Sequence, residues 1–257
     1  MNLDYSLLMP NSFRARLRAG ERLFAPLVTL NSPAVAELLA EAGFDWLFID
    51  AEHSTLDTSQ MQALLQGAGA TPCVIRLSSG DEVPIKKALD IGAAGIIAPQ
   101  VNSVEHARRI VHAAKYAPLG QRGLGIARAH RYGLKVREYM QSANEDTAVI
   151  VQAEHRDAVV NIHEIVQVKG VDGVLIGPYD LSASLGRPGA VDHADVRDAI
   201  ARVRDACLDA RIPIGIFGLN AEAVRPYMEQ GFTMIVAGVD TTLLGNAAVA
   251  LVAALRG

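Results

Sequence analysis

The sequence predicts a single (β/α)8 barrel, and three features of the chain favour this fold class. The length of 257 residues is close to the usual size of such a barrel. Short apolar runs alternate with amphipathic segments from one end of the chain to the other. The apolar runs are continuous and rich in Val and Ile, which is typical of parallel strands buried on both faces.

Eight strand–helix units are expected along the chain. The expected strands are residues 23–30, 45–50, 73–77, 95–101, 148–154, 173–177, 213–217 and 233–237. The expected helices that follow them are residues 33–42, 59–69, 84–91, 104–115, 158–168, 194–210, 221–230 and 242–255. Glycines stand where several helices should turn back into a strand, and these are Gly43, Gly92, Gly170 and Gly231.

No shift in composition divides the chain, so we expect one domain over residues 1–257. The amphipathic stretch 241–255 is expected to form the last helix. One connection, residues 116–133, is long for a compact barrel and is rich in Gly and Arg. Long connections without a clear pattern are usually functional or disordered.

The net charge of −4 indicates no general attraction to nucleic acid or to an anionic membrane. A local basic cluster is present near the N-terminus, at Arg14, Arg16 and Arg18. We interpret it as the solvated face of a short helix.

The first 17 residues lack the apolar stretch of a signal peptide, and the apolar run 247–255 is too short to cross a membrane. Cys73 and Cys207 lie in apolar and helical patterns without metal-site spacing, so both are expected to be reduced core thiols. We therefore expect a cytoplasmic protein.

Ionisable side chains stand at or just after the ends of four expected strands, at the end of a barrel where catalysis takes place. These side chains are Asp50 and His53, Arg76, Glu154, and Asp180. Their convergence on one mouth is the strongest functional signal in the residues themselves.

Glu154 and Asp180 form a candidate metal site on neighbouring strands. Two close carboxylates repel each other unless a proton or a cation lies between them. A hard divalent cation with oxygen ligands is the usual solution. The alternative is that both carboxylates cap the helices that follow them.

Arg76 ends an otherwise apolar strand, so its charge needs either an anionic ligand or oxyanion, or a carboxylate across the barrel. The two roles can coexist. Asp50 could orient the imidazole of His53 and make it a general base, because the two residues lie three positions apart at a strand end.

Other chemistries fit the sequence less well. A Schiff-base aldolase needs a lysine at the site, but every lysine lies on or near an expected helix. The phosphate-binding P-loop and the dinucleotide-binding glycine pattern are absent.

The chain resembles the HpcH/HpaI family of class II, metal-dependent 2-oxo-acid aldolases over residues 13–255. The stretches that carry the resemblance are FDWLFIDAEH (44–53), IKKALDIGAAGIIAPQV (85–101), YAPLGQRGLG (116–125), VQAEH (151–155) and GVLIGPYDLSASLG (173–186). The resemblance implies a phosphoenolpyruvate/pyruvate-type barrel and reversible cleavage of a 4-hydroxy-2-oxo acid to pyruvate, or hydroxypyruvate, and an aldehyde.

The resemblance also implies a role for individual residues. Glu154 and Asp180 would bind Mg²⁺, Mn²⁺ or Co²⁺, with Gln152 beside the metal. Arg76 would contact the keto oxygen that becomes the enolate oxygen. His53, oriented by Asp50, would be the acid/base.

Further implied contacts involve the substrate carboxylate and a second subunit. The backbone amides of Tyr179 and Asp180 would hold the pyruvate carboxylate. Asp90 would reach the site of a neighbouring subunit. The family forms homohexamers, as trimers of dimers with the last helix exchanged between partners.

Four positions near the mouth depart from the pattern of the family, and these are Ala51, Gln100, His155 and Tyr179. None of them removes a catalytic group, but together they leave the aldehyde open. Two alternatives stay open as well: a thioester lyase like citrate lyase or malyl-CoA lyase, and a barrel that binds an oxo acid without turning it over. Oxaloacetate decarboxylation is a hypothesis for a side activity.

Overall fold

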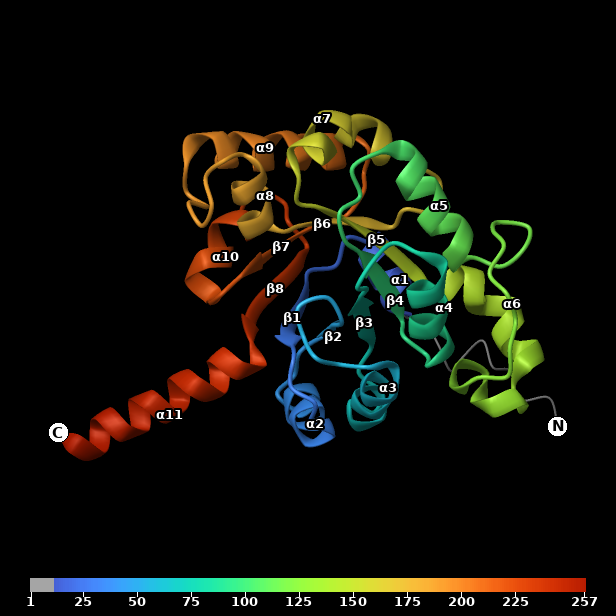
Figure 1. Cartoon of the computed structure of the whole chain (residues 1–257), viewed down its shortest axis with the longest axis horizontal. Helices are drawn as coiled ribbons and strands as arrows, with labels where there is room; N and C mark the ends of the chain where they lie inside the picture. The colour runs from blue at the N-terminus through green and yellow to red at the C-terminus, as the bar shows by residue number, and fades with distance from the viewer. Residues whose placement is uncertain (1–11) are drawn as a thin grey trace.

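The computed structural model describes residues 12–257, which form a closed eight-stranded parallel barrel with helices around it (Figure 1). Each strand pairs with its neighbours in sequence order, and β8 closes the barrel against β1. The strands are β1 (Leu23–Val28), β2 (Leu47–Asp50), β3 (Cys73–Arg76), β4 (Gly95–Ala98), β5 (Ala148–Ala153), β6 (Gly173–Ile176), β7 (Ile214–Gly218) and β8 (Met234–Val239). The (β/α)8 fold predicted from the sequence is confirmed. The expected domain starts at residue 1, but residues 1–11 lie outside the described part.

Helices separate the strands, as the alternating pattern predicts. They are α1 (Phe13–Arg18), α2 (Pro33–Glu41), α3 (Thr58–Gly67), α4 (Glu82–Asp90), α5 (Val104–Ala114), α6 (Val136–Asp146), α7 (Arg156–Ile165), α8 (Pro178–Ser184), α9 (Ala194–Asp209), α10 (Ala221–Met228) and α11 (Asp240–Arg256). The four expected helix-ending glycines all have φ between 90° and 96°, the left-handed region that glycine adopts without strain.

Three of these elements were not expected from the periodicity. The short helix α8 follows β6 directly, where Pro178 occupies a first-turn position that tolerates proline. The long connection after α5 contains a 3-10 segment, η2 (Arg128–Gly133), and leads into α6. His130 of η2 is buried; its Nδ1 accepts the backbone N–H of Gly133, and its Nε2 donates to the carbonyl oxygen of Gly125, so this connection is ordered around it.

The strand period of two divides the core into an inner and an outer layer. Side chains such as Phe48, Val74, Ile150 and Leu175 fill the barrel interior, together with Trp46 and Phe13 of α1 below them. The intervening strand residues pack outward against the helices. Both faces of β2 to β6 are therefore buried, as expected, whereas β1 exposes Phe24 and β7 and β8 are partly buried at a few positions.

The basic cluster on α1 is not the solvated helix face predicted from the sequence. Arg14 is buried and pairs with Asp172 at 2.8 Å and with Glu145 at 3.1 Å. Arg16 pairs with Asp45 and Glu21. The partner carboxylates stand at the amino ends of the strands or beside them, so α1 closes the floor of the barrel.

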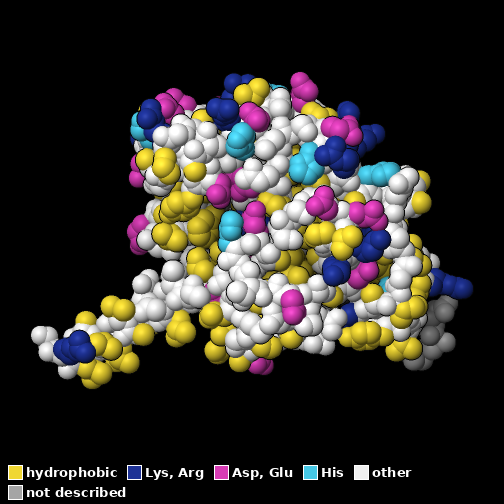
Figure 2. All heavy atoms as spheres, in the orientation of Figure 1, with side chains coloured by type: hydrophobic (Ala, Val, Ile, Leu, Met, Phe, Trp, Pro, Cys, Tyr) yellow, Lys and Arg dark blue, Asp and Glu magenta, His cyan; other side chains and the backbone are white. Residues whose placement is uncertain are grey.

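The last helix, α11, projects away from the barrel, and apolar side chains are exposed along it (Figures 1 and 2). The large apolar side chains exposed on α11 are Leu243, Leu244, Val249, Leu251, Val252 and Leu255. Within residues 12–257, no helix is both long and apolar enough to cross a lipid bilayer.

Candidate active site

Alternate residues of each strand point into the barrel. The inward residues near the carboxyl ends of β2, β3 and β5 are polar, and they point into the mouth of the barrel. In β2 the inward positions run from Phe48 to Asp50, in β3 they end at Arg76, and in β5 they run from Ile150 through Gln152. A cavity of about 180 Å³ opens there. Its polar lining comes from His53, Arg76, Gln152 and Asp180, and its apolar wall from Leu27, Phe48, Leu175 and Phe217. No lysine lines it, which agrees with the exclusion of Schiff-base chemistry.

Asp50 and Arg76 form a buried, two-pronged ion pair at the centre of the mouth. The register of β2 and β3 places the two residues side by side. The Nε and Nη2 of Arg76 donate to the two oxygens of Asp50 at 2.9 and 2.7 Å. The guanidinium also lies over the ring of Phe48. Asp50 therefore fixes the plane of the guanidinium and leaves its remaining N–H groups for a ligand.

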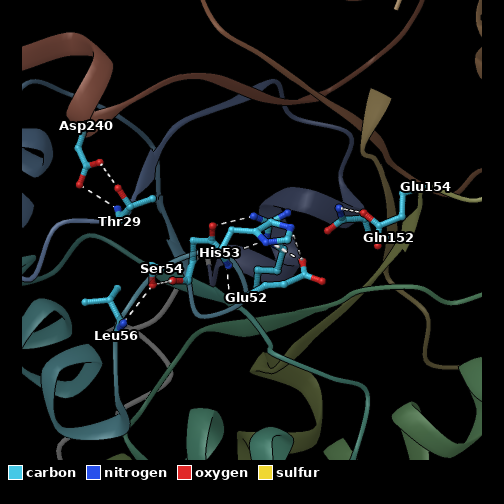
Figure 3. Close-up of polar contacts among 10 residues, drawn as sticks. Thr29, Glu52, His53, Ser54, Leu56, Gln152, Glu154 and Asp240 are labelled. Carbon is cyan, nitrogen blue, oxygen red and sulfur yellow. Dashed lines mark hydrogen bonds and ion pairs between the residues drawn. The ribbon is translucent and has the colours of Figure 1, made fainter. Parts of the chain in front are cut away.

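The imidazole of His53 has a different carboxylate neighbour from the one predicted. Asp50 accepts the backbone N–H groups of Glu52 and His53, and its carboxylate faces Arg76. The Nε2 of His53 instead lies 3.8 Å from Glu52 Oε2, and Figure 3 shows the two side chains together. The expectation that Asp50 orients this ring is therefore corrected. The imidazole is 63% exposed, so it is accessible at the rim of the cavity.

Glu154 lies in a buried pocket of hydrogen-bond donors and acidic neighbours. Its Oε1 accepts the backbone N–H of Gln100 at 2.8 Å, and its Oε2 accepts the side-chain amide of Gln152 (Figure 3). Burial raises the pKa of Glu154 to about 7, and the charges of Glu52 and Asp180 act in the same direction. The Gln100 amide and Arg76 oppose this increase in pKa without cancelling it.

The helix-cap alternative for Glu154 and Asp180 is wrong. His155, not Glu154, caps α7 by accepting the N–H of Asp157. Asp180 lies in the first turn of α8, whose start at Gly177 has no side-chain cap. Both carboxylates are therefore left for another role at the mouth.

The donor set around Glu154 fits a divalent cation. Gln152 Oε1 is buried without a hydrogen-bond partner, and the nearby carboxylates repel each other electrostatically. A Cβ added to Gly177 would come within 2.8 Å of Gln152 Nε2 and 2.9 Å of Glu154 Oε2, so glycine keeps this space open. Oxygen donors of this kind suit a hard cation. In residues 12–257 no group of three or more His, Cys, Asp or Glu side chains would hold a metal, so substrate or water would complete the ligands.

The remaining predicted residues lie at two distinct places. Tyr179 is half-exposed in the wall of the cavity and its ring faces Phe217 at 6.2 Å. Asp90 stands at the end of α4 and accepts a hydrogen bond from Arg122 at 2.8 Å. It does not line the cavity of its own chain.

Sequence reasoning missed two residues of the site. Glu52 lies 3.3 Å from Arg76, and one of its buried oxygens lacks a hydrogen bond. Burial raises its pKa, which Arg76 and His53 partly offset. Gln100 contributes a backbone amide, which no side-chain pattern could have indicated. A larger hollow of about 430 Å³ between α5 and α7 contains none of the predicted residues.

Comparisons with known proteins agree with this geometry. The model of the HpcH/HpaI aldolase/citrate lyase family matches residues 23–247. A "4-hydroxy-2-oxo-heptane-1,7-dioate aldolase" of Shigella sonnei is 42% identical over 249 residues, covering 95% of either chain. A Klebsiella pneumoniae aldolase of the same name is also 42% identical, covering 95% of this chain and 94% of that one. An HpcH/HpaI aldolase/citrate lyase family structure from Burkholderia cenocepacia superposes with a TM-score of 0.92 at 34% identity, covering 95% and 99%.

Proposed function

Because the chain belongs to the HpcH/HpaI aldolase/citrate lyase family and is a class II aldolase, we propose that it reversibly cleaves a 4-hydroxy-2-oxo acid to pyruvate, or hydroxypyruvate, and an aldehyde. The observation that carries the proposal is one small cavity lined by Arg76, Gln152 and Asp180 beside the buried Glu154. The thioester-cleaving alternative is less supported, because the relatives that are 42% identical over 95% of the chain are named aldolases.

Aldolases of this family generally depend on a divalent metal ion. We assign Glu154 and Asp180 as the protein ligands of Mg²⁺, Mn²⁺ or Co²⁺, with Gln152 beside them. The ion, when bound, would polarise the keto group of the substrate as a Lewis acid. The paired hydrogen bonds to Glu154 hold its carboxylate in one orientation for this purpose.

Arg76 would stabilise the negative charge that develops on the keto oxygen. Its guanidinium is held rigidly by Asp50, so it needs little rearrangement when that charge appears. The backbone amides of Tyr179 and Asp180 would bind the substrate carboxylate, since the first turn of α8 leaves amide groups without helical partners.

His53 would move the proton. In the direction of synthesis it would take a proton from the methyl carbon of pyruvate, and the resulting enolate carbon would attack the aldehyde. Glu52 is the carboxylate of the same chain that faces the imidazole. Asp90 would approach the imidazole in the site of a neighbouring copy, since it stands away from the cavity of its own chain.

An acidic aldehyde is the favoured acceptor. The support for it is that the relatives are named for the cleavage of a dioate. The arginines of the long connection support it less than their number suggests, because Arg122 pairs with Asp90 and Arg128 donates to a backbone oxygen of Ile91. Arg131 is exposed, so its guanidinium is accessible to the acidic group of the aldehyde.

Assembly into a homohexamer would cover the apolar face of α11. An exposed row of leucines and valines is unfavourable in water, and a second copy is the partner that the family resemblance implies. The cytoplasmic location stays a prediction.

Exchange of the methyl protons of pyruvate in D2O, followed by NMR, tests the reaction without knowledge of the aldehyde. Protein stripped with EDTA should show little exchange, and added Mg²⁺, Mn²⁺ or Co²⁺ should restore it. A Glu154→Gln variant provides the matched control and should not respond to metal. Folded wild-type protein that exchanges no protons with any of the three ions would contradict the proposal.

A further inference from the structure

Gln100 has an unusual backbone at the mouth of the barrel. It follows β4 and Pro99, and its φ is 53°, in the left-handed region that residues other than glycine seldom adopt. In the described chain, Arg131, Tyr132 and Arg211 are the other residues besides glycine with positive φ. Such a conformation costs energy and persists where the surroundings hold it.

Two contacts involve the backbone of Gln100. Its N–H donates to Glu154 Oε1 at 2.8 Å. The imidazole of His106 on α5 points its N–H toward the backbone carbonyl of Gln100, a contact that opposes the lowering of the His106 pKa by burial. The His106 ring packs directly over Gly80, so closely that a Cβ at that position would collide with Nε2. The ring is therefore wedged between the loop after β3 and the loop after β4.

The amide of Gln100 acts on the carboxylate that the proposed function assigns to the metal. The two oxygens of Glu154 have separate donors, namely the backbone of Gln100 and the side chain of Gln152. A carboxylate held at each oxygen cannot rotate freely, so its remaining lone pairs face a fixed direction. A backbone in the ordinary β region at residue 100 would turn this N–H away from Glu154.

We propose that Gln100 is a positioning residue, whose left-handed backbone aims its N–H at Glu154 and so fixes that carboxylate for a divalent cation. His106 supports it by anchoring the same backbone. This inference rests on the proposed metal site, and it adds a contribution from β4 that the side chains of the mouth do not reveal.

Two substitutions at position 100 distinguish the effect of the backbone conformation on metal binding from the effect of the side chain. Glycine adopts the left-handed region without strain, whereas a β-branched residue strongly disfavours it. Gln100→Gly should keep the amide in place, and Gln100→Val should displace it. Glutamine already occupies this region at some cost, and the β-branched side chain of valine disfavours it further, so we expect Gln100→Val to weaken Mn²⁺ binding about tenfold. Gln100→Gly should stay within about twofold of wild type.

Arg211 offers a matched control at the other end of the barrel. Its φ is 56°, in the turn between α9 and β7, far from the mouth along the strands. Arg211→Val should lower the unfolding temperature and leave Mn²⁺ affinity unchanged. His106→Ala should weaken Mn²⁺ binding in the same direction as Gln100→Val. His112→Ala, an exposed histidine on the same helix, should not.

The measurement is titration of the full-length, EDTA-treated protein with Mn²⁺, by calorimetry and by the loss of the free-ion EPR signal. Folding of every variant is checked by circular dichroism. If Gln100→Val or His106→Ala folds and binds Mn²⁺ as wild type does, while Glu154→Gln loses binding, this inference is overturned alone. If wild-type protein binds no Mn²⁺, the proposed metal site is overturned with it. Should the valine variant fail to fold, the His106→Ala and His112→Ala pair decides.

Discussion

The two ends of the barrel bury charged side chains in opposite ways. At the floor, Arg14 pairs with Asp172, whose other oxygen accepts the backbone N–H of Val149. Lys115 lies beside them and donates to the carbonyl oxygens of Asn144 and Thr147 at 2.7 and 2.6 Å. These groups satisfy one another within the chain.

At the mouth, the charged and polar groups are not all satisfied. Gln152 Oε1 is buried without a hydrogen bond, and Glu52 Oε2 has ion-pair contacts with Arg76 and His53 but no hydrogen bond. The carboxylates of Glu52, Glu154 and Asp180 repel one another. Buried polar atoms that lack partners cost free energy, so they persist where a ligand completes them. The floor is built for stability and the mouth for binding.

A shifted pKa does not distinguish the two ends. Burial lowers the pKa of Lys115 to about 8 at the floor, and burial raises that of Glu154 to about 7 at the mouth. Single neutral atoms without a hydrogen bond occur at both ends, since Trp46 Nε1 and Thr233 Oγ1 at the floor also lack partners. Mutual repulsion of carboxylates at the mouth, as opposed to the pairing of Asp172 with Arg14 at the floor, separates the functional end from the structural one.

The largest expected effect comes from substitution of Arg76, whose guanidinium lies at the centre of the mouth. Arg76→Ala removes the group that would stabilise the enolate oxygen, and should reduce aldol cleavage by about 10²–10³-fold. Arg76→Lys should recover little, because an ammonium cannot reproduce the two-pronged contact with Asp50. Steady-state cleavage of a 4-hydroxy-2-oxo acid at saturating metal measures both. Turnover of Arg76→Ala at the wild-type rate would remove Arg76 from the mechanism.

The matching change at the floor should affect stability and leave catalysis alone. Arg14→Met leaves Asp172 buried without its main partner, which should lower the free energy of unfolding by about 3 kcal/mol. The rate per folded molecule should stay within about twofold of wild type. Urea unfolding and kinetics under native conditions measure the two quantities. A variant that is fully stable but slow would show that the floor communicates with the site.

The difference between the two ends also explains what the sequence could and could not predict. The position of Asp50 and Arg76 at strand ends predicted that both reach the mouth, and the structure shows that both continue the inward columns of β2 and β3. The left-handed glycines marked several helix ends, so the alternation of the eight strands with their main helices followed from local pattern, although α8, η2 and α6 did not.

Contacts between distant residues were beyond local pattern. Arg14 and Asp172 lie 158 positions apart, so nothing near Arg14 indicated that it would be buried. Asp50 was expected to face His53, its near neighbour in sequence, but the register of β2 and β3 sets it beside Arg76. Gln100 contributes through its backbone conformation, which the identity of the residue does not predict.

A third prediction concerns the proton that competes with a cation at the mouth. Since the pKa of Glu154 is about 7 without metal, the carboxyl holds a proton below that pH, and a cation must displace it. Mn²⁺ affinity should rise by up to about tenfold per pH unit below pH 7 and level off above it. Calorimetric titrations at pH 6, 7 and 8 measure this dependence. Equal affinity at all three values would show that Glu154 is ionised throughout.

Ionisation of Glu154 should lower the free energy of unfolding of the metal-free protein as the pH rises. Its folded-state pKa lies above the ordinary 4.5, so between pH 4.5 and about 7 the folded protein binds more protons than the unfolded chain. The stability of wild-type protein relative to Glu154→Gln should therefore fall over this interval, and bound metal should prevent the fall.

The smallest expected effect lies at the floor, where the pKa of Lys115 has the opposite consequence. Its folded-state pKa of about 8 lies below the ordinary 10.5, so between these values the unfolded chain binds more protons. Wild-type stability relative to Lys115→Met should rise with pH in this interval, by about 1 kcal/mol per unit at most. Urea unfolding at pH 8, 9 and 10 measures the difference. A difference that does not change with pH would mean that two backbone carbonyls and the nearby Asp172 compensate the buried ammonium fully, and that the floor is better satisfied than its burial implies.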